Sequence, residues 1–169
     1  MDYGRVGAWS SGMEMLKSSP IFGVGQGLFP EYHERAAHNS YVEVMAEIGI
    51  VGMFLWVALI YITLRDGYKM NKMKSMRQLE DPHCLTDIGM SVFLALLGFL
   101  SIAFFLSRAY NVLLYILIGV WVATASMLRE DNDDLNFKFE ANDFFKVSGL
   151  ILGFILFLYV GVRFLWLAR

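Results

Sequence analysis

The residues most able to carry chemistry gather within the first fifty positions. His38 and Asn39 are adjacent, just before a long apolar run, and Glu43 and Glu47 lie four apart, on one face of any helix that begins there. An imidazole exchanges a proton near neutral pH, but a histidine at a membrane-helix entry can also be an interfacial residue without chemistry. Glu47 lies inside the apolar run, where a carboxylate is costly and normally has a partner or lines a polar cavity. It is a candidate for orienting a base or a cation, and the alternative is a side chain that reaches the nearby surface.

An arginine and a run of glycines precede the histidine. The apolar residues between Val6 and Leu16 are spaced for one face of a short helix, and Arg5 precedes Trp9 by four residues, so these two share a face. Pro20 ends this helix. Alternating glycines follow it: Gly23, Gly25 and Gly27. A run of free backbone N–H groups can cradle an anion, and a plain loop also explains the glycines. The run is not a dinucleotide fingerprint, because no parallel-strand pattern surrounds it.

The sequence predicts neither a metal site nor another cofactor. His33 and His38 are five residues apart with no third ligand nearby, and the single cysteine, Cys84, has only His83 beside it. A lone cysteine also forms no intramolecular disulfide.

Four apolar runs of membrane length dominate the chain. Of its 169 residues, 57% are hydrophobic, and the mean hydropathy is +0.50. About 20 residues at a rise of about 1.5 Å each cross the hydrocarbon core. We therefore predict an all-α polytopic transmembrane helical bundle of about four spans, with a helical extracytoplasmic N-terminal segment, rather than a soluble bundle of buried helices. The predicted parts are an extracytoplasmic segment at 1–43, a span at 44–64, a cytoplasmic loop at 65–87, a span at 88–106, a short outer loop and span at 107–128, a cytoplasmic loop at 129–146 and a span at 147–169.

The placement of basic residues predicts the orientation of these spans. The linker at 65–87 holds five basic residues and the linker at 129–146 holds three, whereas only Arg108 lies between the second and third spans. Positive residues favour the cytoplasm, so both long linkers are expected inside, and the N-terminal segment and the C-terminus outside. The net charge of −2 offers no basic surface suited to nucleic acid.

The string AHNSYVEVMAEIGIVG resembles the signature of the O-antigen ligase superfamily, which includes lipopolysaccharide O-antigen ligases, O-antigen polymerases and O-linked oligosaccharyltransferases. The signature is His, then Asn, Ser or Gln, nine residues, Gly, two residues, and Gly, Thr or Tyr. His38, Asn39, Gly49 and Gly52 fit it at every position. The preceding Arg–x3–Trp pair and the Pro–x2–Gly–x–Gly–x–Gly run also resemble the family, in the same order. The resemblance covers residues 5–56 and is only compositional beyond them.

This resemblance implies a glycosyltransferase in the bacterial inner (cytoplasmic) membrane. The family moves a glycan from an undecaprenyl-pyrophosphate carrier to an acceptor hydroxyl on the outer side. The acceptor is lipid A–core for ligases, a growing glycan for polymerases and a protein side chain for oligosaccharyltransferases. Members are thought to work without a metal. The expected partners are therefore the lipid-linked glycan donor, the acceptor and the bilayer.

The resemblance also implies roles for particular residues. His38 is expected to take the proton of the acceptor hydroxyl, and Arg5 to bind the departing pyrophosphate, with Arg35 as a second choice. The glycine loop could add backbone donors. Asn39 would fix the imidazole or cap the helix. Glu47 and Trp9 would support the site without touching the substrate.

Members of the family have many helices before the external loop, so we expect this chain to be the C-terminal part of a larger or split protein, with an N-terminal half as a partner. Two other functions remain open. A small transporter subunit would use Glu47 and His38 in a relay, and would predict charges in several spans, although two of the four have none. An inactive fragment would only assemble with partners.

Overall fold

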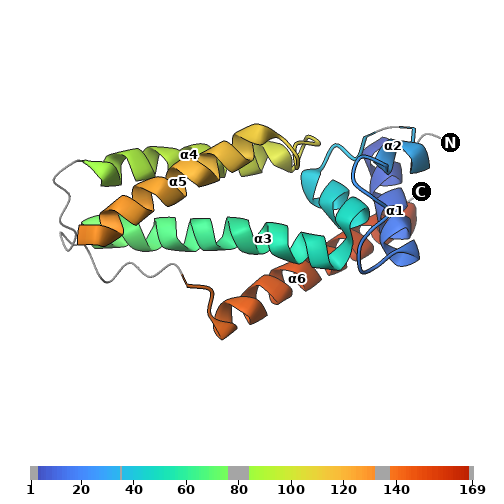
Figure 1. Cartoon of the computed structure of the whole chain (residues 1–169). Helices are drawn as coiled ribbons and strands as arrows, with labels where there is room; N and C mark the ends of the chain where they lie inside the picture. The colour runs from blue at the N-terminus through green and yellow to red at the C-terminus, as the bar shows by residue number, and fades with distance from the viewer. Residues whose placement is uncertain (1–3, 35, 76–83, 132–137, 168–169) are drawn as a thin grey trace. The chain divides into compact units, whose positions relative to one another are not determined.

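The computed structural model describes residues 4–34, 36–75, 84–131 and 138–167, and in these ranges every regular element is an α-helix (Figure 1). The helices are α1 (Gly4–Ser18), α2 (Phe29–Tyr32), α3 (Ser40–Ser75), α4 (Leu85–Ala103), α5 (Val112–Asp131) and α6 (Ala141–Leu167). Four of them, α3 to α6, are long and apolar enough to cross a membrane. The predicted all-α polytopic fold with four spans is therefore confirmed. The positions of the membrane boundaries remain predictions.

One compact unit contains every predicted site residue that the structure describes. It consists of Met1–Val57, Ile102–Ala109 and Asn142–Arg169. In this unit α1 and α2 lie beside the first part of α3 (Figure 1). A close approach occurs at Gly12, where an added Cβ would lie 2.6 Å from Val42 Cγ1. Val42 and the neighbouring Phe29 are buried, so α1 and α2 cover an apolar core on α3.

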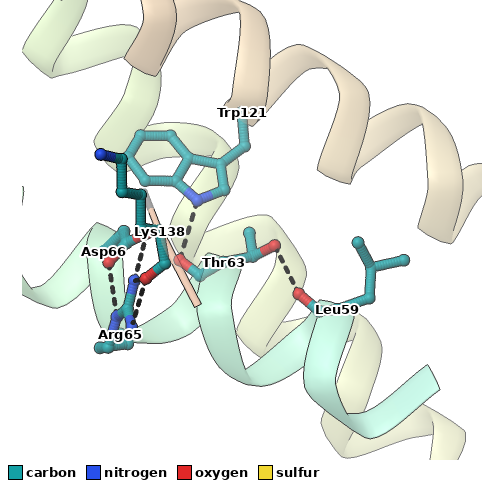
Figure 2. A network of polar contacts seen from close by, with 6 residues as sticks. All are labelled: Leu59, Thr63, Arg65, Asp66, Trp121 and Lys138. Carbon is teal, nitrogen blue, oxygen red and sulfur yellow. Dashed lines mark hydrogen bonds and ion pairs between the residues drawn. The ribbon is translucent and has the colours of Figure 1, made fainter. Parts of the chain in front are cut away.

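The second unit consists of Ala58–Ser101 and Tyr110–Ala141. Its polar contacts include one that joins two helices (Figure 2). The Trp121 indole N–H donates to the Thr63 carbonyl at 2.8 Å, which joins α5 to α3. Arg65 donates to both carboxylate oxygens of the buried Asp66, at 2.7 and 3.1 Å, and also to the Lys138 carbonyl. The Trp121 indole N–H and the Asp66 carboxylate therefore both have partners, as is usual for buried polar groups.

Candidate functional site

The glycine loop, residues 19–28 between α1 and α2, crosses α3 at a break in that helix. The break is at Gly49, whose φ of 65° and ψ of −167° lie in a region open essentially only to glycine. Backbone groups on both sides of the break take their hydrogen-bond partners from the loop. These bonds are Val24 N–H to Ala46 O (3.0 Å), Gly25 N–H to Glu47 O (2.9 Å), Ile50 N–H to Pro20 O (2.9 Å) and Val51 N–H to Ile21 O (3.2 Å). The loop therefore satisfies carbonyl and N–H groups that a break inside a membrane span would otherwise leave without partners.

Two glycines allow the crossing, because the backbones of the loop and of α3 nearly touch there. A Cβ added to Gly49 would lie 2.5 Å from Gly23 N and 2.5 Å from Ile21 O. A Cβ added to Gly23 would lie 2.6 Å from Gly49 N. Both glycines also have positive φ, at 65° and 72°. The structure thus gives a physical reason for glycine at each of these positions.

Glu47 ties the end of the same loop to α3. Its Oε2 accepts a hydrogen bond from the Gly27 N–H at 2.9 Å, and its Oε1 accepts one from the Phe29 N–H at 3.0 Å. The side chain is only 1% exposed. A carboxylate offers two acceptor oxygens and no donor, which matches two backbone N–H groups. The partner expected for a carboxylate at this depth is thus the glycine loop, and Glu47 positions that loop at the start of α2.

The loop glycines use their N–H groups inside the chain. Gly23 donates to the Ser19 carbonyl, Gly25 to the Glu47 carbonyl and Gly27 to the Glu47 carboxylate. Of the two interpretations that the sequence left open, this geometry favours a structural loop over an anion cradle. These three glycines therefore have a structural role beside the site.

His38 and Asn39 directly precede α3. His38 is exposed and has a φ of 49°, a left-handed conformation that is uncommon outside glycine and is often kept at functional sites. Asn39 Oδ1 accepts hydrogen bonds from the N–H groups of Tyr41 (2.9 Å) and Val42 (3.2 Å), so the amide caps the helix. Its Nδ2 is buried and has no partner within the described residues. Asn39 therefore fixes the backbone beside His38 and keeps one donor available.

Trp9 links the helix that carries Arg5 to the histidine. Its indole N–H donates to the Ala37 carbonyl at 3.2 Å, directly before His38. Arg5 lies one turn earlier on the same face of α1 and is exposed, and its guanidinium carbon is 6.0 Å from the centre of the Phe105 ring. This hydrogen bond joins α1, which carries Arg5, to the backbone directly before His38.

The turn between α4 and α5 completes this region, and sequence reasoning missed it. The buried Ser40 hydroxyl donates to the Leu106 carbonyl and accepts from the Arg108 N–H, both at 2.7 Å. Glu43 accepts a hydrogen bond from the Ala109 N–H. The contacts join residues more than sixty positions apart, and no local pattern in the sequence signals them.

Aromatic rings pack together at the same turn. Phe104 makes an edge contact with Trp9, with ring centres 6.2 Å apart, and a tilted contact with Tyr41 at 6.3 Å. Tyr41 in turn packs edge-on against Trp56 at 5.4 Å. Such ring pairs hold α1, the turn and α3 in fixed mutual positions.

Two predictions are not placed in this geometry. Arg35 lies outside the described residues. As for metals, the described part of the chain brings no three His, Cys, Asp or Glu side chains together in a way that could hold an ion.

A comparison with protein families identifies the region just described. Residues 2–57 match the family described as "O-Antigen ligase". No curated protein matches the chain, and no solved structure matches it. The matched segment contains α1, the glycine loop, α2 and the start of α3, together with the break at Gly49. Residues 2–57 of this multi-pass membrane protein are therefore similar to the O-antigen ligase family.

Proposed function

We propose that the chain takes part in transferring a glycan from undecaprenyl pyrophosphate to an acceptor hydroxyl in cell-surface polysaccharide synthesis. The reaction would take place on the outer side of the bacterial inner membrane. The observation that carries the proposal is the Trp9–Ala37 hydrogen bond, because it connects a base candidate to a phosphate-binding candidate inside the segment that matches the family. Both side chains, His38 and Arg5, are exposed and so accessible to a substrate.

In the proposed step, the acceptor oxygen attacks the anomeric carbon of the glycan. His38 takes the proton from the acceptor hydroxyl as the new C–O bond forms. The bond from the anomeric carbon to the diphosphate breaks, and its electron pair leaves with undecaprenyl pyrophosphate. His38 then releases the proton to solvent. A diphosphate is already a good leaving group, so these residues need no metal to assist it.

Arg5 is proposed to bind the departing diphosphate. A guanidinium matches phosphate oxygens with two parallel N–H donors and keeps its charge at any physiological pH. Its place over the Phe105 ring limits the directions in which it can point. Arg35, three residues before His38 in the sequence, is proposed as a second cation for the same diphosphate.

The other predicted residues would act through the backbone. Asn39 holds the first turn of α3, and with it the backbone beside His38. Glu47 and the loop glycines Gly23, Gly25 and Gly27 keep α2 and the start of α3 in place. In this proposal they position the catalytic backbone and do not contact the diphosphate.

The orientation of the spans is part of the proposal. The N-terminal segment and the turn between α4 and α5 belong to one compact unit, which also contains α6 from Asn142 onward. We propose that the N-terminal segment and this turn face the outside, where lipid-linked glycan and acceptor meet, and that the basic linkers face the cytoplasm.

The test uses the native gene, so that any partner protein is retained. His38→Ala and Arg5→Ala are expected to remove surface polysaccharide and to cause lipid-linked glycan to accumulate, with normal amounts of protein in the membrane. Lys69→Ala, which removes an exposed cation from the second unit, is the matched control and should behave like wild type. Wild-type polysaccharide in both site variants would refute the assignment. Loss of polysaccharide without accumulation of the donor would favour the inactive-fragment or transporter alternatives.

A further inference from the structure

A groove with charged residues lies in the same unit, and His38 is not among its lining residues. One wall is α1 and the other is the C-terminal part of α6, and the cavity between them has a volume of about 360 Å³. Its lining residues are Ser10, Met13, Glu14, Lys17, Tyr159, Val162 and Arg163. A volume of this size is at the lower end of the range for small-ligand sites, and it suits a compact polar headgroup.

The charges in the groove favour an anion. Lys17 and Arg163 contribute two positive charges, and Glu14 contributes one negative charge. The Arg163 Nη1 donates to the Tyr159 hydroxyl at 3.2 Å, one turn earlier on α6, which directs the guanidinium along the helix. An arginine near the end of an apolar span usually pairs with an anion or reaches the interface, and a tyrosine hydroxyl does not neutralise its charge.

Exposed apolar side chains lie within a few residues of the lining in the sequence, on α6 and after α1. On α6, Val160 and Phe164 are 55% and 69% exposed, and after α1, Ile21 and Phe22 are 58% and 74% exposed. Because α6 is long and apolar enough to cross a membrane, its exposed apolar side chains suit contact with lipid chains.

We propose that the groove between α1 and α6 binds the phosphate of a membrane lipid. Lys17 and Arg163 contact the phosphate oxygens, and the lipid chain runs along the exposed apolar residues of α6. Anionic phospholipid and polyprenyl phosphate share this chemistry, a phosphate ester on a long aliphatic chain. The proposal does not depend on glycan transfer, because it concerns different residues and a binding event without chemistry.

The test is lipid binding to the purified full-length chain in mild detergent, measured by native mass spectrometry. Phosphatidylglycerol, undecaprenyl phosphate and uncharged diacylglycerol are titrated separately. The first or second lipid is expected to bind, and diacylglycerol to bind far more weakly. Loss of a charge-assisted contact weakens binding by about tenfold or more, so Lys17→Ala and Arg163→Ala should each show that loss. Both side chains are exposed, so these variants should fold normally.

Two further variants sharpen the test. Lys146→Ala removes an exposed cation from the other end of α6 and should leave lipid binding unchanged. Glu14→Gln removes the only negative charge of the lining and should tighten binding of the anionic lipid. Whichever phosphate lipid binds more tightly identifies the source. Equal binding of diacylglycerol and the phosphate lipids, or wild-type affinity in a double variant at Lys17 and Arg163, would overturn the proposal.

Discussion

Replacing Gly49 with alanine should be among the most damaging small changes in this chain. The residue lies in a backbone region that costs other residues about 1–3 kcal/mol, and its φ is 65°. The added Cβ would also lie 2.5 Å from Gly23 N and from Ile21 O. These are backbone atoms that side-chain rotation cannot move away. Overpacking of this kind costs typically about 1–3 kcal/mol more. The sum is roughly 2–6 kcal/mol.

Two glycine variants provide a graded control for this prediction. Gly27→Ala introduces strain alone, because φ is 79° and nothing lies within 4 Å of the new Cβ. It should cost about 1–2 kcal/mol. Gly153→Ala, in the helical part of α6, has open space and no positive φ, so its stability should equal wild type or rise by at most about 1 kcal/mol.

Thermal unfolding of the detergent-solubilised protein, followed by tryptophan fluorescence, measures the series. At about 2–4 °C per kcal/mol for a chain of this size, Gly49→Ala should lower Tm by roughly 5–20 °C. From highest to lowest, the expected order of Tm is Gly153→Ala, Gly27→Ala and Gly49→Ala. A Gly49→Ala chain that does not fold agrees with its place as the least stable variant. A Tm of Gly49→Ala equal to that of Gly153→Ala would refute the crossing of loop and helix.

Three further predictions concern the site itself. Glu47→Gln places an amide NH₂ against a backbone N–H of the loop and should lower the free energy of unfolding by about 1–3 kcal/mol. The expected readouts are a lower Tm and faster proteolysis within residues 20–28. An unchanged Tm and unchanged proteolysis would refute the carboxylate's role. Trp9→Phe keeps an aromatic ring, although a smaller one, but loses the bond to the Ala37 carbonyl. Deuterium uptake at residues 36–40 should therefore rise in hydrogen-exchange mass spectrometry, and equal uptake would contradict the link. His38→Gly relieves the strain of the left-handed backbone conformation, so this variant should be about 1 kcal/mol more stable than His38→Ala. Both variants should lose glycan transfer equally. A His38→Gly variant that still transfers glycan would show that the imidazole is not part of the mechanism.

The sequence alone predicted the features that depend on local composition. The four apolar runs predicted the membrane-length helices, because length and hydropathy decide whether a segment can span a bilayer. Pro20 and the glycines after it predicted the end of the first helix and the loop. Asn39 before an apolar run indicated a helix cap, and the amide does cap α3.

The features that depend on distant contacts could not be predicted. The depth of Glu47 signalled that it needed a partner, but the partner is the backbone of a loop twenty residues earlier. The glycine alternation favoured a plain loop and also allowed an anion cradle, and only the break at Gly49 shows what the loop hydrogen-bonds to. The bond from Ser40 to the turn at Leu106 joins segments that share no local pattern.

Glycan transfer in membrane vesicles from cells that carry the variant native gene tests the central claim most directly. Vesicles are supplied with labelled undecaprenyl-pyrophosphate-linked glycan, and release of free undecaprenyl pyrophosphate is followed together with labelled acceptor. With equal amounts of protein in the membrane, His38→Gln is expected to abolish both products, while Lys69→Ala vesicles form them at the wild-type rate. Formation of both products at the wild-type rate by His38→Gln vesicles would contradict the account.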